Sequence, residues 1–173
     1  MLPDDEPVRV VEYDPEWAVL GAELVEQVGG ELRGWLVEVE HIGSTAVPGL
    51  DAKPVIDLQV GCEEPDVAAV LRRIRRLGFD HLGQQGTDEW REYLRRRSGG
   101  CLANIHVVER GGRLWTDNVM FRDYLRNHPQ AAADYARVKR AAAHAAGRLR
   151  RYSELKASTV MQIMMEMRAA ADQ

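Results

Sequence analysis

Residues 40–60, EHIGSTAVPGLDAKPVIDLQV, join two apolar runs through a Gly-Ser-Thr turn. The first run spans residues 35–42 and is interrupted by charges, whereas the second spans residues 54–60 and is nearly continuous. A nearly continuous apolar run predicts a strand that is covered on both faces. Asp57 lies inside this run, and an ionised aspartate is costly to bury without a partner. We therefore expect Asp57 to have either a buried partner or a function.

The residues before Asp57 suggest what that function is. Gly43, Ser44 and Thr45 form a predicted turn whose backbone N–H groups and hydroxyls point into one concavity, an arrangement that binds phosphates. Lys53 adds a cation, and Asp57 is placed to hold a metal ion that bridges to such phosphates. The alternative is a plain hairpin in which a neighbouring arginine pairs with Asp57. The residues alone leave both interpretations open.

Residues 41–60 resemble the signature of the GrpB family, which is related to the nucleotidyltransferase superfamily. That superfamily has a Gly-Ser pair, a spacer, and then Asp-x-Asp or Asp-x-Glu on a strand, and Gly43, Ser44 and Asp57 match it. Two later stretches also resemble GrpB, NIHVV at residues 104–108 and MFRDYLRNHPQAAADYARVK at residues 120–139; Tyr152 and Lys156 in the last helix are a weaker match. The resemblance implies an α/β (α+β) fold: a nucleotidyltransferase-like mixed β-sheet flanked by helices, with a helical C-terminal part, in a single domain over residues 1–173.

The chain departs from the superfamily pattern at the second carboxylate, where it has Gln59. Two-metal nucleotidyl transfer needs carboxylates to hold two divalent ions. The later strand that supplies a third carboxylate in the superfamily offers His106 instead. The expected catalytic residues are Asp57 and His106, and the expected metal ligands are Asp57, His106 and His41. The divalent metal expected at such a site is Mn²⁺ or Mg²⁺, with Zn²⁺ less favoured.

The function implied by the resemblance is the binding of a nucleotide or phosphorylated small molecule, with metal-dependent nucleotidyl or phosphoryl transfer. Lys53, Arg122 and Lys156 would neutralise the phosphates, although a helix-surface ion pair for Arg122 and a solvated position for Lys156 are the alternatives. Gln59 leaves open whether the protein is an enzyme. The second hypothesis is a catalytically degenerate module that binds a nucleotide or a coenzyme A-related ligand, since GrpB-like segments also occur fused to a dephospho-coenzyme A kinase.

The composition indicates a mildly acidic protein. The 173 residues include 23 Lys and Arg against 27 Asp and Glu, a net charge of −4, which argues against general nucleic-acid binding. The two cysteines, Cys62 and Cys101, show no disulfide framework and favour a reducing compartment. The acidic N-terminus lacks the apolar core of a signal peptide, and no run has membrane-spanning length. These features predict a cytoplasmic protein without a membrane partner, and its oligomeric state stays open.

Periodicity and turn residues predict the remaining elements. Strands are expected at residues 8–13, 35–42, 54–60, 79–82, 90–97 and 101–108, with 90–97 at an edge of the sheet and a loop at 83–88. Helices are expected at residues 14–28, 63–77, 115–126 and 129–146, with Gly147 as a candidate break and a last helix capped by Ser153. A methionine stripe in the last helix is expected in the core: Met161, Met164, Met165 and Met167.

Overall fold

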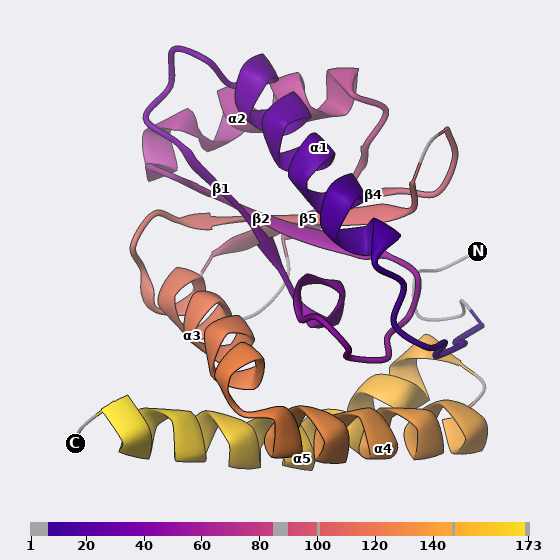
Figure 1. Ribbon diagram of the computed structural model, residues 1–173. Helices are drawn as coiled ribbons and strands as arrows, with labels where there is room; N and C mark the ends of the chain where they lie inside the picture. The colour runs from indigo at the N-terminus through magenta and orange to yellow at the C-terminus, as the bar shows by residue number, and fades with distance from the viewer. Residues whose placement is uncertain (1–6, 85–89, 100, 147, 172–173) are drawn as a thin grey trace.

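The computed structural model describes residues 7–84, 90–99, 101–146 and 148–171. One β-sheet forms the middle layer, with helices on both of its faces (Figure 1). Helices α1 (Glu16–Glu31) and α2 (Val67–Arg76) cover one face, and α3 (Arg113–Asn127), α4 (Pro129–Ala146) and α5 (Leu149–Ala171) lie on the other side. The predicted mixed sheet flanked by helices, with a helical C-terminal part, is confirmed. None of the helices in the described ranges is both long and apolar enough to span a membrane.

The described residues form a five-stranded sheet in the order β1-β2-β5-β4-β3. Strands β1 (Glu38–Ile42) and β2 (Ile56–Cys62) are antiparallel, and β2 runs parallel to β5 (Ala103–Glu109). Strands β3 (Asp80–Gln84) and β4 (Arg91–Arg96) complete an antiparallel meander with β5. The single parallel pair follows from the long connection between β2 and β5, which carries α2 and two strands before it returns to the centre of the sheet.

The two faces of the central strands differ sharply in polarity. Successive side chains of a strand point to opposite faces, so Asp57 and Gln59 of β2 share one face with Asn104 and His106 of β5. The other face is apolar and packs against α1 and α2 in the main core, which includes Leu24, Val28, Ile56, Leu58, Val60, Ile74, Ile105 and Val107. The polar face therefore looks toward the C-terminal helices.

A second, smaller core joins the C-terminal helices to the loop after β1. Its buried members are Val47, Leu50, Leu125, Tyr135, Ala136 and Ile163. Polar contacts strengthen this join, because the ammonium group of Lys139 donates a hydrogen bond to the Asp51 carbonyl and Arg140 pairs with the Asp51 carboxylate. The loop that carries the Gly-Ser-Thr turn is thus held against α4.

Several local predictions were wrong. Strand β4 lies between β5 and β3, so it is internal and the edges of the sheet are β1 and β3. The strand expected at residues 8–13 is reduced to isolated bridges of Pro7 with Arg148 and Val11 with Ala52. Helix α5 begins before the expected cap, and its Met161 and Met165 are 65% and 71% exposed. Gly147 and residues 85–88 of the expected loop lie outside the described residues.

Candidate functional site

A cavity of about 770 Å³ lies between the polar face of the sheet and the C-terminal helices. Its volume falls within the range of small-molecule binding sites. The sheet and its loops contribute Gly43, Ser44, Thr45, Lys53, Asp57, Arg91 and His106, and the helices contribute Asp117, Asn118, Phe121, Tyr135, Tyr152, Ser153 and Lys156. Seven of the residues singled out in the sequence therefore line one cavity: Gly43, Ser44, Thr45, Lys53, Asp57, His106 and Lys156.

The turn at Gly43 depends on the absence of a side chain. Gly43 has φ +72°, and a Cβ there would lie 2.9 Å from the Asp57 carboxylate oxygen Oδ2. Only glycine allows this backbone conformation and this close approach without strain. The short 3-10 helix η2 (Ser44–Ala46) follows directly, and the Thr45 hydroxyl donates to the Val55 carbonyl over 3.4 Å. The turn is thereby fixed next to the start of β2.

Asp57 is held by neutral side chains from the neighbouring strands. Its Oδ1 accepts a hydrogen bond of 2.7 Å from the Asn104 side-chain nitrogen Nδ2, and the Asn104 side-chain oxygen Oδ1 accepts one of 2.8 Å from the Tyr93 hydroxyl. The Tyr93 hydroxyl therefore fixes the orientation of the Asn104 amide, which in turn orients the carboxylate. No arginine pairs with Asp57 within the residues that the structure describes, so the plain-hairpin alternative is wrong about its partner.

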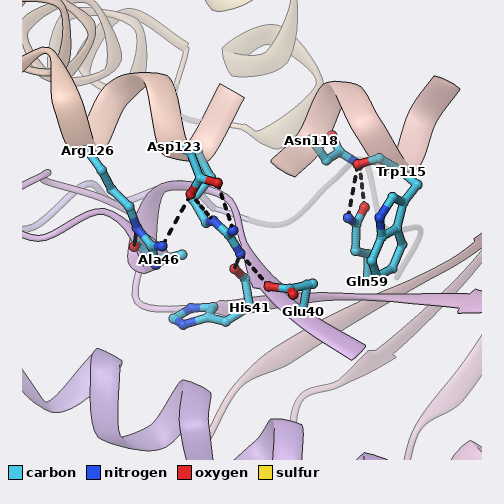
Figure 2. Close-up of polar contacts among 9 residues, drawn as sticks. Glu40, His41, Ala46, Gln59, Trp115, Asn118, Asp123 and Arg126 are labelled. Carbon is cyan, nitrogen blue, oxygen red and sulfur yellow. Dashed lines mark hydrogen bonds and ion pairs between the residues drawn. The ribbon is translucent and has the colours of Figure 1, made fainter. Parts of the chain in front are cut away.

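Gln59 occupies the position of the second carboxylate but faces helix α3 instead of the cavity. It is fully buried, and its amide nitrogen donates to the Trp115 carbonyl over 3.2 Å while its oxygen accepts from Asn118 over 3.0 Å (Figure 2). Both halves of the amide are therefore engaged. The described part of the chain also contains no group of three His, Cys, Asp or Glu residues arranged to hold a metal ion. These residues do not fit a two-metal centre.

His41 lies outside the cavity, on the side facing α1. Its Nε2 is hydrogen bonded to the Thr45 hydroxyl over 3.0 Å, and its ring contacts Gly21 so closely that a Cβ there would lie 2.2 Å from Nδ1. Burial lowers the pKa of His41 to about 4, so the imidazole is neutral at neutral pH. The predicted metal-ligand set of Asp57, His106 and His41 is therefore not formed, because His41 is hydrogen bonded to the turn from the α1 side of the sheet.

Arg122 also lies outside the cavity. Its guanidinium donates to Glu40 over 2.6 Å, to the His41 carbonyl over 3.0 Å and to Asp123 over 2.7 Å. Figure 2 shows the Glu40, His41 and Asp123 acceptors together with Arg126, which donates to the Ala46 carbonyl. Helix α3 is thus anchored to β1 and η2. The predicted contact of Arg122 with a ligand phosphate does not fit this geometry, because its donors are already used.

The lysines of the cavity gather around one tyrosine. The ammonium groups of Lys53 and Lys156 lie 5.9 and 5.1 Å from the centre of the Tyr152 ring. Burial lowers the pKa of Lys156. Burial and the neighbouring Lys156 together lower the pKa of the buried Lys139 to about 7. Three lysine side chains therefore lie close together where α4 and α5 meet the loop before β2.

Other lining residues were not identified from the sequence. They are Arg91, Asp117, Asn118, Phe121, Tyr135 and Ser153. Arg91 lies in the segment that was expected to be an edge strand, and Asn118 lies in the helix expected at residues 115–126. No local pattern marks these positions, because they reach the cavity only through the packing of α3 and α5 on the sheet.

The fold places the protein in the nucleotidyltransferase-fold class. The structure is similar to that of Cid1 poly(U) polymerase with bound Mg 3′-dATP, with a TM-score of 0.57 over 84% of this chain and 49% of that one. The identity is 13%, so the similarity concerns the fold.

Residues 7–166 match the family model described as GrpB protein, and the chain belongs to the GrpB family. Conserved protein GrpB from Enterococcus faecalis has a similar crystal structure, with a TM-score of 0.83 and 30% identity, covering 95% of this chain and all of that one. The UPF0157 protein BH1888 of Halalkalibacterium halodurans is 31% identical over 95% of this chain and 84% of its own length. A dephospho-CoA kinase of Mycolicibacterium paratuberculosis is 30% identical over 79% of this chain, which matches only 40% of that protein.

Proposed function

We propose that the cavity binds a nucleotide or a related phosphorylated small molecule, and that binding does not require a divalent metal. The observation that carries this proposal is the convergence of Lys53 and Lys156 on the same side of a cavity that also contains the Gly43 turn. Phosphates are bound by such combinations of ammonium groups and backbone turns.

Lys156 is the strongest individual argument for an anionic ligand. Within the part of the chain that the structure describes, its ammonium contacts the Tyr152 ring but has no ion-pair partner. Burial lowers its pKa, and the Asp57 carboxylate only partly opposes that effect. Lys156 is half-buried, and a charge that is partly removed from water without a partner is unfavourable. A ligand phosphate would pair with this ammonium group and stabilise its charged form.

The aromatic side chains on the helical side suit the remainder of a nucleotide. Phe121, Tyr135 and Tyr152 line the cavity beside the lysines. Aromatic rings stack on all nucleobases, without strong preference for one base. Burial raises the pKa of Tyr135 to about 12, so its phenol stays protonated at neutral pH. The cavity therefore combines a cationic part with an aromatic part.

Metal-dependent transfer is less well supported than binding. Two-metal transfer of a nucleotidyl or phosphoryl group needs several carboxylates around the ions. Gln59 is engaged with α3, and the cavity offers Asp57 together with Asp117, which pairs with Arg168 over 2.7 Å. The binding module thus fits these residues better than the transferase does. Coenzyme A and dephospho-coenzyme A are included among the ligands to be tested because one relative is named a dephospho-CoA kinase.

A thermal-shift and calorimetric screen tests the proposal. ATP, coenzyme A and dephospho-coenzyme A are titrated in EDTA and again with Mn²⁺, using wild type and Lys156→Gln. At least one ligand is expected to raise the melting temperature in EDTA, and Lys156→Gln is expected to weaken that ligand about tenfold. Arg72→Gln, an exposed change on α2, serves as the charge-matched control. Binding only with Mn²⁺, or release of pyrophosphate from ATP that Asp57→Asn abolishes, would favour the transferase instead.

A further inference from the structure

Two buried polar atoms of the cavity lack hydrogen-bond partners within the described residues: Arg91 Nε and His106 Nδ1. Over the same residues, the rest of the Arg91 guanidinium also makes no hydrogen bond or ion pair. Arg91 and His106 are half-buried residues, but these two atoms are shielded from solvent, and buried polar atoms are nearly always satisfied. These two atoms therefore have the character of binding groups whose partner is not among the described residues.

Strand register places this pair away from the Gly43 turn. Arg91 is paired with Val108, and Val108 is paired with Gly61 on β2. Asp57, which contacts Gly43, lies four residues earlier on β2, and so the backbone of Arg91 is about 13 Å farther along the strands. His106 shares the Arg91 face of the sheet and lies between these two levels. Because the Asp57 charge acts on Lys156, that lysine belongs to the Gly43 end of the cavity, and the backbone of Arg91 lies at the other end.

The carboxylates of the cavity do not supply the missing partner. Asp117 pairs with Arg168 over 2.7 Å, and Asp57 accepts its hydrogen bond from Asn104. Burial, with a smaller contribution from the Arg91 charge, lowers the pKa of His106 to about 4. A neutral imidazole can donate one hydrogen bond beside the guanidinium. An oxyanion can accept from both donors and also pairs with the charge of the guanidinium.

We propose that Arg91 and His106 form a second anion-binding subsite, and that the ligand carries two oxyanionic groups, one at the lysines and one at this pair. This inference rests on the proposed function, since it assumes that the first phosphate lies near Lys53 and Lys156. It adds a ligand class: nucleotides with phosphates at two separate positions are favoured over nucleotides whose phosphates are consecutive.

Two adenine nucleotides with two phosphates each distinguish these classes. ADP has both phosphates on the 5′ position, whereas adenosine 3′,5′-bisphosphate has them on opposite sides of the ribose. Calorimetry with wild type is expected to give about tenfold tighter binding of the 3′,5′-bisphosphate. Arg91→Gln is expected to remove this preference by weakening the bisphosphate alone. Arg91→Lys, which keeps the charge, is expected to keep part of it.

The outcomes separate this inference from the proposed function. Equal binding of ADP and the 3′,5′-bisphosphate, or an equal loss of both in Arg91→Gln, overturns the second subsite while leaving phosphate binding intact. Failure of AMP, ADP and the bisphosphate to bind wild type overturns the proposed function and the subsite with it. Arg72→Gln, on the opposite side of the sheet, is expected to bind both ligands as wild type does, and melting temperatures verify that each variant is folded.

Discussion

Replacing Gln59 with glutamate tests whether the second-carboxylate position has become a structural one. The change keeps the size of the side chain but substitutes an oxygen for the amide nitrogen. In the wild type that nitrogen donates to the Trp115 carbonyl, and the side chain is fully buried. An ionised glutamate would still accept from Asn118, but it would present an oxygen to the Trp115 carbonyl oxygen. The protonated form would instead donate to that carbonyl.

The magnitude follows from burial and from the lost hydrogen bond. Loss of one buried hydrogen bond costs about 1 kcal/mol, and burial of the charge adds roughly several more. The folded state of Gln59→Glu therefore prefers the protonated form of the introduced carboxyl group, which raises the pKa of that group above its unfolded value of about 4.3. Relative to wild type, stability is fully retained below that unfolded pKa and is lost as pH rises, by about 1.4 kcal/mol per pH unit until the folded pKa is passed.

Urea unfolding at pH 5 and pH 8 measures this effect, with each variant compared with wild type at the same pH. Gln59→Glu is expected to be at least about 3 kcal/mol less stable than wild type at pH 8 and closer to it at pH 5. Gln59→Leu loses both hydrogen bonds without adding a charge, so its deficit of about 2 kcal/mol should not depend on pH. If Gln59→Glu is as stable as wild type at pH 8, or if Mn²⁺ stabilises it, then the conclusion that position 59 is structural is refuted.

Three further predictions concern the cavity and its supports. Burial lowers the pKa of His106 to about 4, so as pH falls below about 6.5 the unfolded chain takes up a proton before the folded chain does. The free energy of unfolding of wild type should therefore fall by about 2 kcal/mol by pH 4.5. Urea titrations of His106→Asn should not show this loss. Arg122→Met removes the buried anchor of α3 and should cost about 3 kcal/mol, whereas Arg137→Met, which breaks an exposed pair, should cost under about 0.5 kcal/mol. Gly43→Ala should cost about 2 kcal/mol by thermal unfolding, since φ is +72° and the new Cβ would lie 2.9 Å from Asp57; an unchanged melting temperature would contradict that geometry.

Local pattern was enough for most helices and strands. Pro129 and the alanine-rich stretch predicted α4 with its observed bounds, Pro129–Ala146, because proline at a helix start and high helix propensity act locally. The same logic failed for β4, whose arginines suggested an edge strand. Strand order depends on which segments pair across the sheet, and side-chain character alone does not specify those pairings. Met161 and Met165 were misassigned to the core for a similar reason, since α5 packs along only one of its faces.

The sequence by itself determined the hairpin around residues 40–60 and the proximity of Gly43 to Asp57, because a short connection and strand register bring these positions together. It also determined the family, whose motifs lie within continuous stretches of chain. Only the tertiary structure decided that Gln59 is hydrogen bonded to helix α3 and that Arg91 and His106 line the same cavity. The physical reason is that the partner of a buried polar side chain is supplied by whichever distant element packs over it, and that packing is a property of the folded chain as a whole.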